Sequence, residues 1–363
     1  MSVEKNIIAV AKDLIKFRSV STEVKELNLC AKYIQDFFNG TDLSVKYFEH
    51  KGSPSIIVTK NTKTPKILLV GHFDVVQGED EQFSPRIDGD RLYGRGALDM
   101  KTANSVLMHI MQTAATNDWD VGLMLTGDEE IGGFNGVKYL LDKEGYSCQL
   151  AIIPDGGFAV DVIVSKAKGL LHIAFHAVGK SAHASRPWEG DNPIDKLLTV
   201  LNKLETMFVP LSKHPSDHWV NTINISRFES GCSYNYIPSE ASVYVDIRFV
   251  EGETADGWLK KIKKCLPKDV TMRVDVAGEP IDMSHSPLLK DYAGVVQNVL
   301  GKEAKYKVDF GTSDARHFAQ HGIPVVINQP TGVGHHTKDE WVSVSSVGKF
   351  YEILASYLDN FAV

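Results

Sequence analysis

Residues 66–74 read KILLVGHFD, and the pattern that starts here indicates the fold class. A short apolar run is typical of a buried strand, and this one ends in two polar side chains, His72 and Asp74. Apolar residues then recur at helical spacing over residues 103–114. Further short apolar runs are predicted to be strands at residues 55–58, 121–125 and 150–153. Alternating strands and helices predict an α/β fold, a mostly parallel sheet in an α/β/α sandwich.

The periodicity changes near residue 167. Residues 170–178 alternate apolar and polar side chains, and Asn192-Pro193 has the form of a helix N-cap followed by proline at the first helical position. The order of elements from there is β-α-β-β-α-β, as in ferredoxin-like α+β units. The α/β pattern resumes after residue 281. We therefore expect a discontinuous catalytic domain, residues 1–166 and 282–363, with an inserted domain at 167–281.

Composition excludes several classes of function. The 363 residues are 43% hydrophobic and 23% charged, and 39 basic against 46 acidic residues give a formal charge of −7. Nucleic-acid binding and anionic membranes require basic surfaces, so neither partner is expected. The four cysteines form no CxxC pair, and the first residues have helical spacing rather than a signal-peptide pattern. These features predict a soluble, cytoplasmic enzyme with reduced cysteines.

Acidic or histidine residues follow four strands of the predicted catalytic domain. They are His72 and Asp74, the run Asp128-Glu129-Glu130, Asp155, and the pair His335 and His336. In open α/β sheets the carboxyl ends of the strands border the ligand crevice, so these side chains should converge. Asp99 lies just before the helix predicted at residues 103–114. Imidazole and carboxylate without thiolate are the ligands of catalytic zinc and related ions, and there are enough here for two ions.

The neighbouring polar residues suggest divided roles. His72 and Asp74 are two positions apart, so one could bind metal while the other orients a ligand. Glu129 and Glu130 could likewise separate ligation from proton transfer. Each has a simpler structural interpretation: Asp99 could be a helix N-cap, and the acidic run could be a solvated face.

The motifs resemble those of the co-catalytic zinc metallopeptidases, which include succinyl-diaminopimelate desuccinylase, acetylornithine deacetylase, aminoacylase, glutamate carboxypeptidases and several dipeptidases. The resemblance spans nearly the whole chain, in order. The matching motifs are Gly71-His72-Phe73-Asp74, Gly94-Arg95-Gly96-Ala97-Leu98-Asp99-Met100-Lys101, Asp128-Glu129-Glu130-Ile131-Gly132, Gly179-Lys180-Ser181-Ala182-His183, Asn235-Tyr236-Ile237-Pro238, Gly311-Thr312-Ser313-Asp314, and His336 with Glu340.

The resemblance implies a role for each matching residue. Asp99 would bridge two Zn²⁺ ions per subunit, with Co²⁺ or Mn²⁺ as possible substitutes. His72 and Asp155 would complete one site, and Glu130 and His336 the other. The remaining roles would be orientation of His72 by Asp74, general base and acid catalysis by Glu129, oxyanion binding by His183 from the inserted lid, and substrate contacts by Asn235, Arg248, Gly311 and Thr312. Such lids often form homodimers, with the histidine acting across the interface.

Several alternatives stay open. His335 competes with His336 as a ligand, although the glutamate four residues after His336 favours the latter. Arg248 could simply pair with Asp246 on its own strand. Aspartate at position 155 points to aminopeptidases or dipeptidases, whereas residues 311–316 look like the deacylases. The expected function is a metal-dependent amidohydrolase for small peptides or N-acyl amino acids. The alternatives are a dedicated biosynthetic deacylase, of the acetylornithine or succinyl-diaminopimelate type, and an inactive metal-binding homologue.

Overall fold

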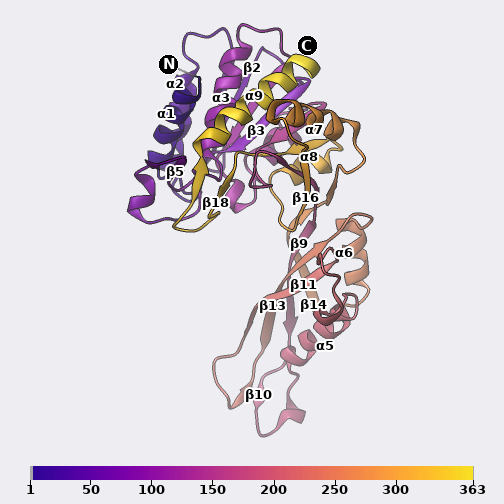
Figure 1. Ribbon diagram of the computed structural model, residues 1–363. Coiled ribbons are helices and arrows are strands. Elements are labelled where there is room, and N and C mark those ends of the chain that lie inside the picture. The colour runs from indigo at the N-terminus through magenta and orange to yellow at the C-terminus, as the bar shows by residue number, and fades with distance from the viewer. Residues whose placement is uncertain (1–2, 363) are drawn as a thin grey trace. The chain divides into compact units, whose positions relative to one another are not determined.

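The computed structural model describes residues 3–362, which form two compact units (Figure 1). The first unit runs to Lys166, resumes over Asp282–Asp309 and continues from Ser313. The second comprises Ala167–Ile281 and the short segment Phe310–Thr312. The sequence analysis did not assign residues 310–312 to the second unit, because a segment of three residues is too short to show a periodic pattern.

A nine-stranded mixed sheet forms the centre of the first unit, in the order β1-β2-β6-β3-β7-β17-β8-β15, with β16 also pairing with β8. Strands β6, β3, β7 and β17 are mutually parallel, and β1 and β2 add an antiparallel hairpin. The predicted α/β class with a mostly parallel sheet is confirmed. The strands are β1 (Ser44–His50), β2 (Ser53–Thr59), β3 (Ile67–His72), β6 (Val121–Thr126), β7 (Leu150–Ile153), β8 (Val162–Ala167), β15 (Ile281–Asp282), β16 (Lys305–Asp309) and β17 (Val325–Ile327).

The helices of this unit bury apolar faces against the sheet and one another. Helix α3 is buried on nearly every side because α1, α9, β3 and β6 all contact it. This explains why polar residues such as Asn104 and His109 are buried along an otherwise amphipathic helix. The helices are α1 (Val3–Lys16), α2 (Val24–Phe37), α3 (Lys101–Ala114), α4 (Val137–Asp142), α7 (Pro287–Leu300), α8 (Ala315–Gln320) and α9 (Val344–Phe361).

A small antiparallel sheet, in the order β18-β19-β5-β4, joins distant parts of the first unit. Its strands are β4 (Arg86–Asp88), β5 (Arg91–Tyr93), β18 (Gly332–Val333) and β19 (Trp341–Ser343). Pairing of β5 with β19 brings the loop that follows β5, which carries Asp99, beside the loop that carries His335 and His336. The sequence analysis did not foresee this sheet, since three-residue strands show no periodicity.

The second unit has the predicted β-α-β-β-α-β order. Its antiparallel sheet runs β11-β13-β9-β14, and α5 and α6 pack on one face of it (Figure 1). Asn192 caps α5 as predicted, because its side chain accepts a hydrogen bond from the Ile194 N–H over 3.1 Å. The elements are β9 (Gly169–Val178), α5 (Pro193–Glu205), β11 (Thr222–Ser230), β13 (Glu240–Phe249), α6 (Ala255–Lys263) and β14 (Val270–Gly278), with the short strands β10 (Ala182–His183) and β12 (Tyr236–Ile237).

Within residues 3–362, no helix has both the length and the apolar character needed to cross a bilayer. All four cysteines are free, in agreement with the sequence-based prediction.

Candidate active site

His72 is the last residue of β3, and two contacts fix its ring. Its Nδ1 donates to the backbone carbonyl of Asp74 over 3.0 Å and lies 3.4 Å from the Asp74 carboxylate. Its Nε2 donates to Asp99 Oδ1 over 3.0 Å. Burial disfavours a charged His72, but these hydrogen bonds raise the pKa of the imidazole well above its usual value. Because Nδ1 is held by Asp74, Nε2 is the nitrogen that would bind a metal ion in place of its proton.

Asp99 lies at the centre of the cluster. One carboxylate oxygen contacts His72, while Oδ2 lies 2.8 Å from His335 Nε2 and 3.0 Å from His336 Nε2. Burial would raise the pKa of Asp99, yet these three imidazoles hold it well below the ordinary range. The N-cap residue of α3 is Met100. Asp99 is therefore not the helix N-cap, which was its simpler structural interpretation.

The loop carrying Asp99 is held by a residue to which the sequence analysis gave no role of its own. Glu340 is buried, and its Oε1 accepts hydrogen bonds from the backbone N–H groups of Leu98 (2.8 Å) and Asp99 (3.1 Å). Its Oε2 accepts from Gly96 N–H and from Arg95 Nη1. The spacing of Glu340 four residues after His336 was the available signal, but the sequence could not show which backbone it holds.

Glu129 and Glu130 occupy a 3₁₀ turn, Glu129–Ile131, directly after β6. Asp74 holds this turn, because its Oδ1 accepts from the Glu129 N–H and its Oδ2 from the Glu130 N–H, each over 3.1 Å. Ser21 Oγ also donates to Asp74 Oδ2 over 2.6 Å, a contact that the sequence analysis missed. Asp74 therefore connects the histidine of one strand to both glutamates of another.

The two glutamates have different surroundings. The Glu130 carboxylate accepts a hydrogen bond from His336 Nε2, at 3.1 to 3.2 Å. Among residues 3–362, the Glu129 carboxylate has no hydrogen-bond or ion-pair partner. Burial raises the pKa of Glu129 well above its usual value, and the charge of Asp155 adds to the effect. Of the two glutamates, Glu130 is thus paired with a histidine, whereas the Glu129 side chain is not, among the described residues.

Asp155 follows β7 and faces the same cluster. Ligand atoms of His72, Asp99 and Asp155 lie within 4.8 Å of one another, and so do those of Asp99, His335 and His336. Asp99 belongs to both groups, one oxygen directed to each. Oxygen and imidazole nitrogen are suitable donors for Zn²⁺, Co²⁺ and Mn²⁺, so the chemistry of these residues fits divalent metal ions.

The electrostatics of the cluster also favour cation binding. Burial, with the charge of Asp99, raises the pKa of Asp155 to about 7. Hydrogen bonds to Asp99 and Glu130 raise the pKa of His336 to about 10. Both shifts reflect closely spaced carboxylates, and such a concentration of negative charge favours a bound cation.

The other predicted residues belong to the second unit. His183 in β10 pairs with Tyr236 of β12, and the backbone carbonyl of the neighbouring Asn235 accepts from the Ala184 N–H over 3.0 Å. His183 is exposed, and its Nδ1 lies 2.8 Å from Ser185 Oγ. The structure therefore places His183 of β10 beside Asn235, which directly precedes β12.

Arg248 makes the pairing that was its structural alternative. Its Nε and Nη2 donate to the two carboxylate oxygens of Asp246 over 2.7 and 2.9 Å. Its Nη1 reaches Thr312 Oγ1 at 3.5 Å, and Thr312 and Gly311 lie in the short segment that joins this unit. The guanidinium keeps one edge that Asp246 does not occupy.

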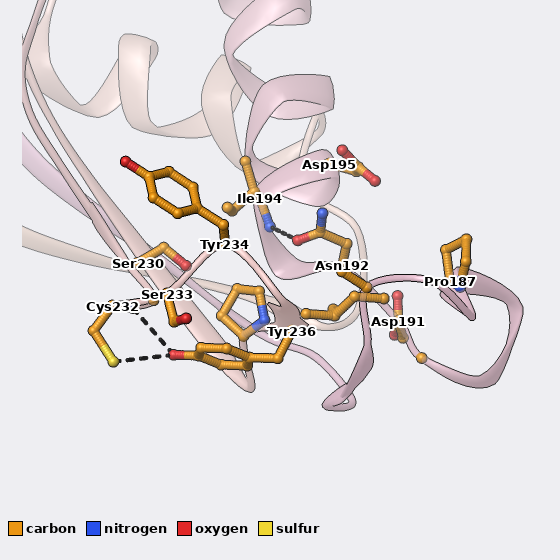
Figure 2. Close-up of a pocket in the computed structure, with 15 residues that line it drawn as sticks. Pro187, Asp191, Asn192, Ile194, Asp195, Ser230, Cys232, Ser233, Tyr234 and Tyr236 are labelled. Atoms are coloured by element: carbon orange, nitrogen blue, oxygen red, sulfur yellow. Dashed lines mark hydrogen bonds between the residues drawn. The ribbon is translucent and has the colours of Figure 1, made fainter.

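A surface pocket in the second unit lies between the start of α5 and residues 230–238 (Figure 2). Tyr236 Oη accepts from the Cys232 N–H over 3.1 Å on its wall, and Asp191 and Asp195 line the opposite side. Among the residues that line it, the sequence analysis named Asn192 as a helix cap and Tyr236, Ile237 and Pro238 as part of a motif, but it predicted no pocket.

A parallel-sheet α/β unit that gathers imidazole and carboxylate groups at its strand ends is typical of metallopeptidases. The sequence model of peptidase family M20/M25/M40 matches residues 68–360. The chain therefore belongs to this family, whose members are hydrolases of amide and peptide bonds, and the family resemblance drawn from the motifs is confirmed.

Individual relatives agree with this placement. A succinyl-diaminopimelate desuccinylase of Rickettsia bellii is 24% identical over 375 residues, which cover 96% of this chain and 94% of that protein. The M20 family metallo-carboxypeptidase Sso-CP2 of Sulfolobus solfataricus has a TM-score of 0.79 at 19% identity, with 100% of both chains covered. The Bacillus subtilis YxeP protein, a dinuclear metal binding peptidase from the M20 family, has a TM-score of 0.69 at 14% identity over 98% of this chain and 97% of that one.

Proposed function

We propose that this protein is a two-metal amidohydrolase that cleaves the amide bond of a small peptide or an N-acyl amino acid. The observation that carries the proposal is the position of the Asp99 carboxylate between two sets of imidazoles. One oxygen contacts His72, and the other contacts His335 and His336. A carboxylate with potential metal ligands on both sides would be suited to help hold two ions.

Two sets of residues would hold the ions. We assign His72 and Asp155 to one ion, Glu130 and His336 to the other, and Asp99 to both. His336 is preferred to His335 because only His336 also contacts Glu130. When bound, the ions would supply Lewis acidity, lowering the pKa of a water molecule and polarising the substrate carbonyl. Zn²⁺ is the proposed metal, with Co²⁺ or Mn²⁺ as substitutes.

Glu129 would act as the general base and acid. Its carboxylate would take a proton from the attacking water and deliver it to the leaving amine. Burial raises the pKa of Glu129, and a higher pKa makes its carboxylate a stronger proton acceptor. Asp74 would hold both the base and His72, since it contacts the backbone of the turn and the imidazole. A base with a free carboxylate argues against an inactive homologue.

The second unit would act as a lid and dimerisation domain that completes the substrate site. His183 would donate to the oxyanion, in a homodimer across the subunit interface, and Asn235, Gly311 and Thr312 would contact the substrate. Arg248 would bind a free substrate carboxylate through the edge that Asp246 leaves open. Free cysteines are consistent with a cytoplasmic location.

Two kinds of substrate are candidates, and they differ in the group on the acyl side of the scissile amide bond. The desuccinylase of Rickettsia bellii favours an N-acyl substrate with a deacylase role, whereas aspartate at position 155 favours a free α-amino group, as in dipeptidases. We propose a small substrate with a free carboxylate in either case.

A hydrolysis panel tests the proposal. Dipeptides, N-acetyl, N-succinyl and N-formyl amino acids are incubated with metal-loaded protein, beside matched C-terminal amides. We expect one acyl class to be cleaved and its amides to react at least about tenfold more slowly, because Arg248 loses its anion. Efficient cleavage of long or amidated peptides would refute the substrate assignment, and no hydrolysis of any amide would refute the function.

A further inference from the structure

Two side chains of helix α8 converge on the turn that carries Glu129 and Glu130. Arg316 Nη2 donates to the carbonyl oxygen of Gly132 over 2.6 Å, and His317 Nε2 donates to the same oxygen over 3.1 Å. Gly132 ends the turn, and its N–H donates back to the Glu129 carbonyl over 2.7 Å. A helix 184 residues further along the chain therefore fixes the end of the turn.

The contact is close at the level of the backbone. Gly133 has φ +61°, and an added Cβ there would lie 1.9 Å from Asp314 Oδ1 and 3.1 Å from His317 Nε2. The Arg316 guanidinium is buried and also donates to the Ser313 carbonyl over 3.2 Å. The turn has little space to move toward α8. The Arg316 guanidinium connects it to Ser313, because it donates to the carbonyls of both Gly132 and Ser313.

The turn is thus held at both ends by different chemistry. At its start the Asp74 carboxylate accepts the N–H groups of Glu129 and Glu130. At its end Arg316 and His317 donate to Gly132. Burial and the nearby guanidinium lower the pKa of His317 to about 3, so this imidazole is neutral and serves as a hydrogen-bond donor without adding a charge.

We propose that Arg316 is a positioning residue, supported by His317, that aims the Glu129 carboxylate and the Glu130 ligand by fixing Gly132. Arg316 reaches no reacting atom and acts through the turn. The inference rests on the proposed function, because it requires Glu129 to be the base. Misplacing a catalytic group by ~1 Å can cost about 10²-fold in rate, so loss of this anchor should act on kcat.

A structural role must be separated from positioning, since Arg316 also provides the positive charge beside the buried Asp314 carboxylate. Arg316→Lys keeps that charge but cannot donate to the Gly132 and Ser313 carbonyls at the same time, as the guanidinium does. Arg316→Met loses both the charge and the hydrogen bonds. Arg273→Met is the matched control, because Arg273 is exposed and pairs only locally with Asp275. The variants are compared in kcat, KM, thermal midpoint and Zn²⁺ titration.

We expect Arg316→Met to lower kcat about 10- to 100-fold with KM within about threefold. Binding of the more weakly held Zn²⁺ should fall about tenfold, because Glu130 is displaced. Arg316→Lys should lie between this variant and the wild type, and Arg273→Met should match the wild type. If Arg316→Met does not fold, Arg316→Lys carries the same comparison.

A double variant decides between the roles. In single-turnover assays at Zn²⁺ concentrations that saturate every variant, Glu129→Gln/Arg316→Met should be as slow as Glu129→Gln alone, because a misplaced base costs nothing once the base is gone. Losses that multiply would overturn the positioning role, as would wild-type kcat and Zn²⁺ binding in Arg316→Met. Wild-type kcat in Glu129→Gln would instead refute the role of Glu129 as the base, and no hydrolysis of any amide by the wild type would refute the proposed function, so the failures are distinguishable.

Discussion

Asp74 shows how much of this site depends on single buried side chains. It contacts His72 and the backbone of Glu129 and Glu130, and Ser21 donates to it. Glu340 does the same for the loop of Asp99. Carboxylates that accept several N–H donors form rigid anchors, because charge-assisted hydrogen bonds are about twice as strong as neutral ones. The proposed metal donors and the proposed proton-transfer group are therefore held in place by residues to which we assign no contact with metal or substrate.

Glu129→Gln is the most direct test at this scale. The amide preserves the size of the side chain but cannot accept the proton of the attacking water. We expect kcat to fall by at least ~10²–10⁴ while metal content and KM stay near wild type. Metal content is measured by plasma mass spectrometry and rates by initial-velocity assays. Loss of metal would make Glu129 a ligand, and near-normal kcat would locate the base elsewhere.

His336→Ala and His335→Ala form a matched pair of adjacent substitutions. His336 contacts both Asp99 and Glu130, whereas His335 contacts Asp99 and stacks on His336. We expect His336→Ala to lose one of two bound ions and His335→Ala to keep both. The measurement is metal stoichiometry after dialysis against metal-free buffer. The opposite pattern would exchange the roles of the two histidines.

At the scale of elements, β11 is an edge strand of the sheet in the second unit, with Ile225 42% and Phe228 39% exposed. Unpaired edges are available to pair with another chain, which motivates the proposed homodimer. We expect sedimentation to show a dimer and Ile225→Lys to weaken it, since a lysine on an edge opposes pairing. Leu211→Lys, at an exposed position of the same unit, is the control. A compact, active monomer would contradict both the dimer and a role of His183 across the interface.

Strand β13 carries a pH-dependent contribution to stability. Although burial alone would raise the pKa of Asp246, hydrogen bonds from His172 and Arg248 lower it to about 2. The unfolded value is about 3.9, so the contribution is complete above about pH 4 and is lost as the pH falls toward 2. We expect Asp246→Asn to reduce the free energy of unfolding by roughly 2 kcal/mol at most at pH 6, and by less at pH 3. Urea unfolding at both pH values measures it. A difference that does not change with pH would show that charge is not its source.

At the scale of the whole molecule, metal removal should affect both activity and stability. The buried carboxylates of the cluster repel one another without cations, and ligands that bind only the folded state stabilise it by mass action. At ion concentrations 100 times the dissociation constant, we expect about 2.7 kcal/mol of stabilisation per site. Chelator-treated protein should be inactive, with a lower thermal midpoint, and should regain activity with about two Zn²⁺, Co²⁺ or Mn²⁺ ions per chain. Full activity with one tightly held ion would contradict the two-metal mechanism.

Periodicity alone determined the main elements. The apolar run of β3, the helical spacing of α3 and the alternation in β9 and β13 were all correct, because burial of one face imposes a regular pattern on the chain. The motifs also led to the M20 family, since chemistry at strand ends constrains residue types locally. The sequence alone was therefore enough to identify the motifs around Glu129 and Asp99 as candidate parts of the site.

Contacts between distant segments were decided only by the tertiary structure. Pairing of β5 with β19 brings the Asp99 loop beside Glu340, and α8 reaches Gly132 from 184 residues away. Neither the three-residue strands nor the side chains of Ser21 and Arg316 leave a periodic signal. Their partners are backbone groups or buried carboxylates, and the sequence does not reveal which backbone amide or carbonyl will lie within hydrogen-bonding distance until the chain has folded.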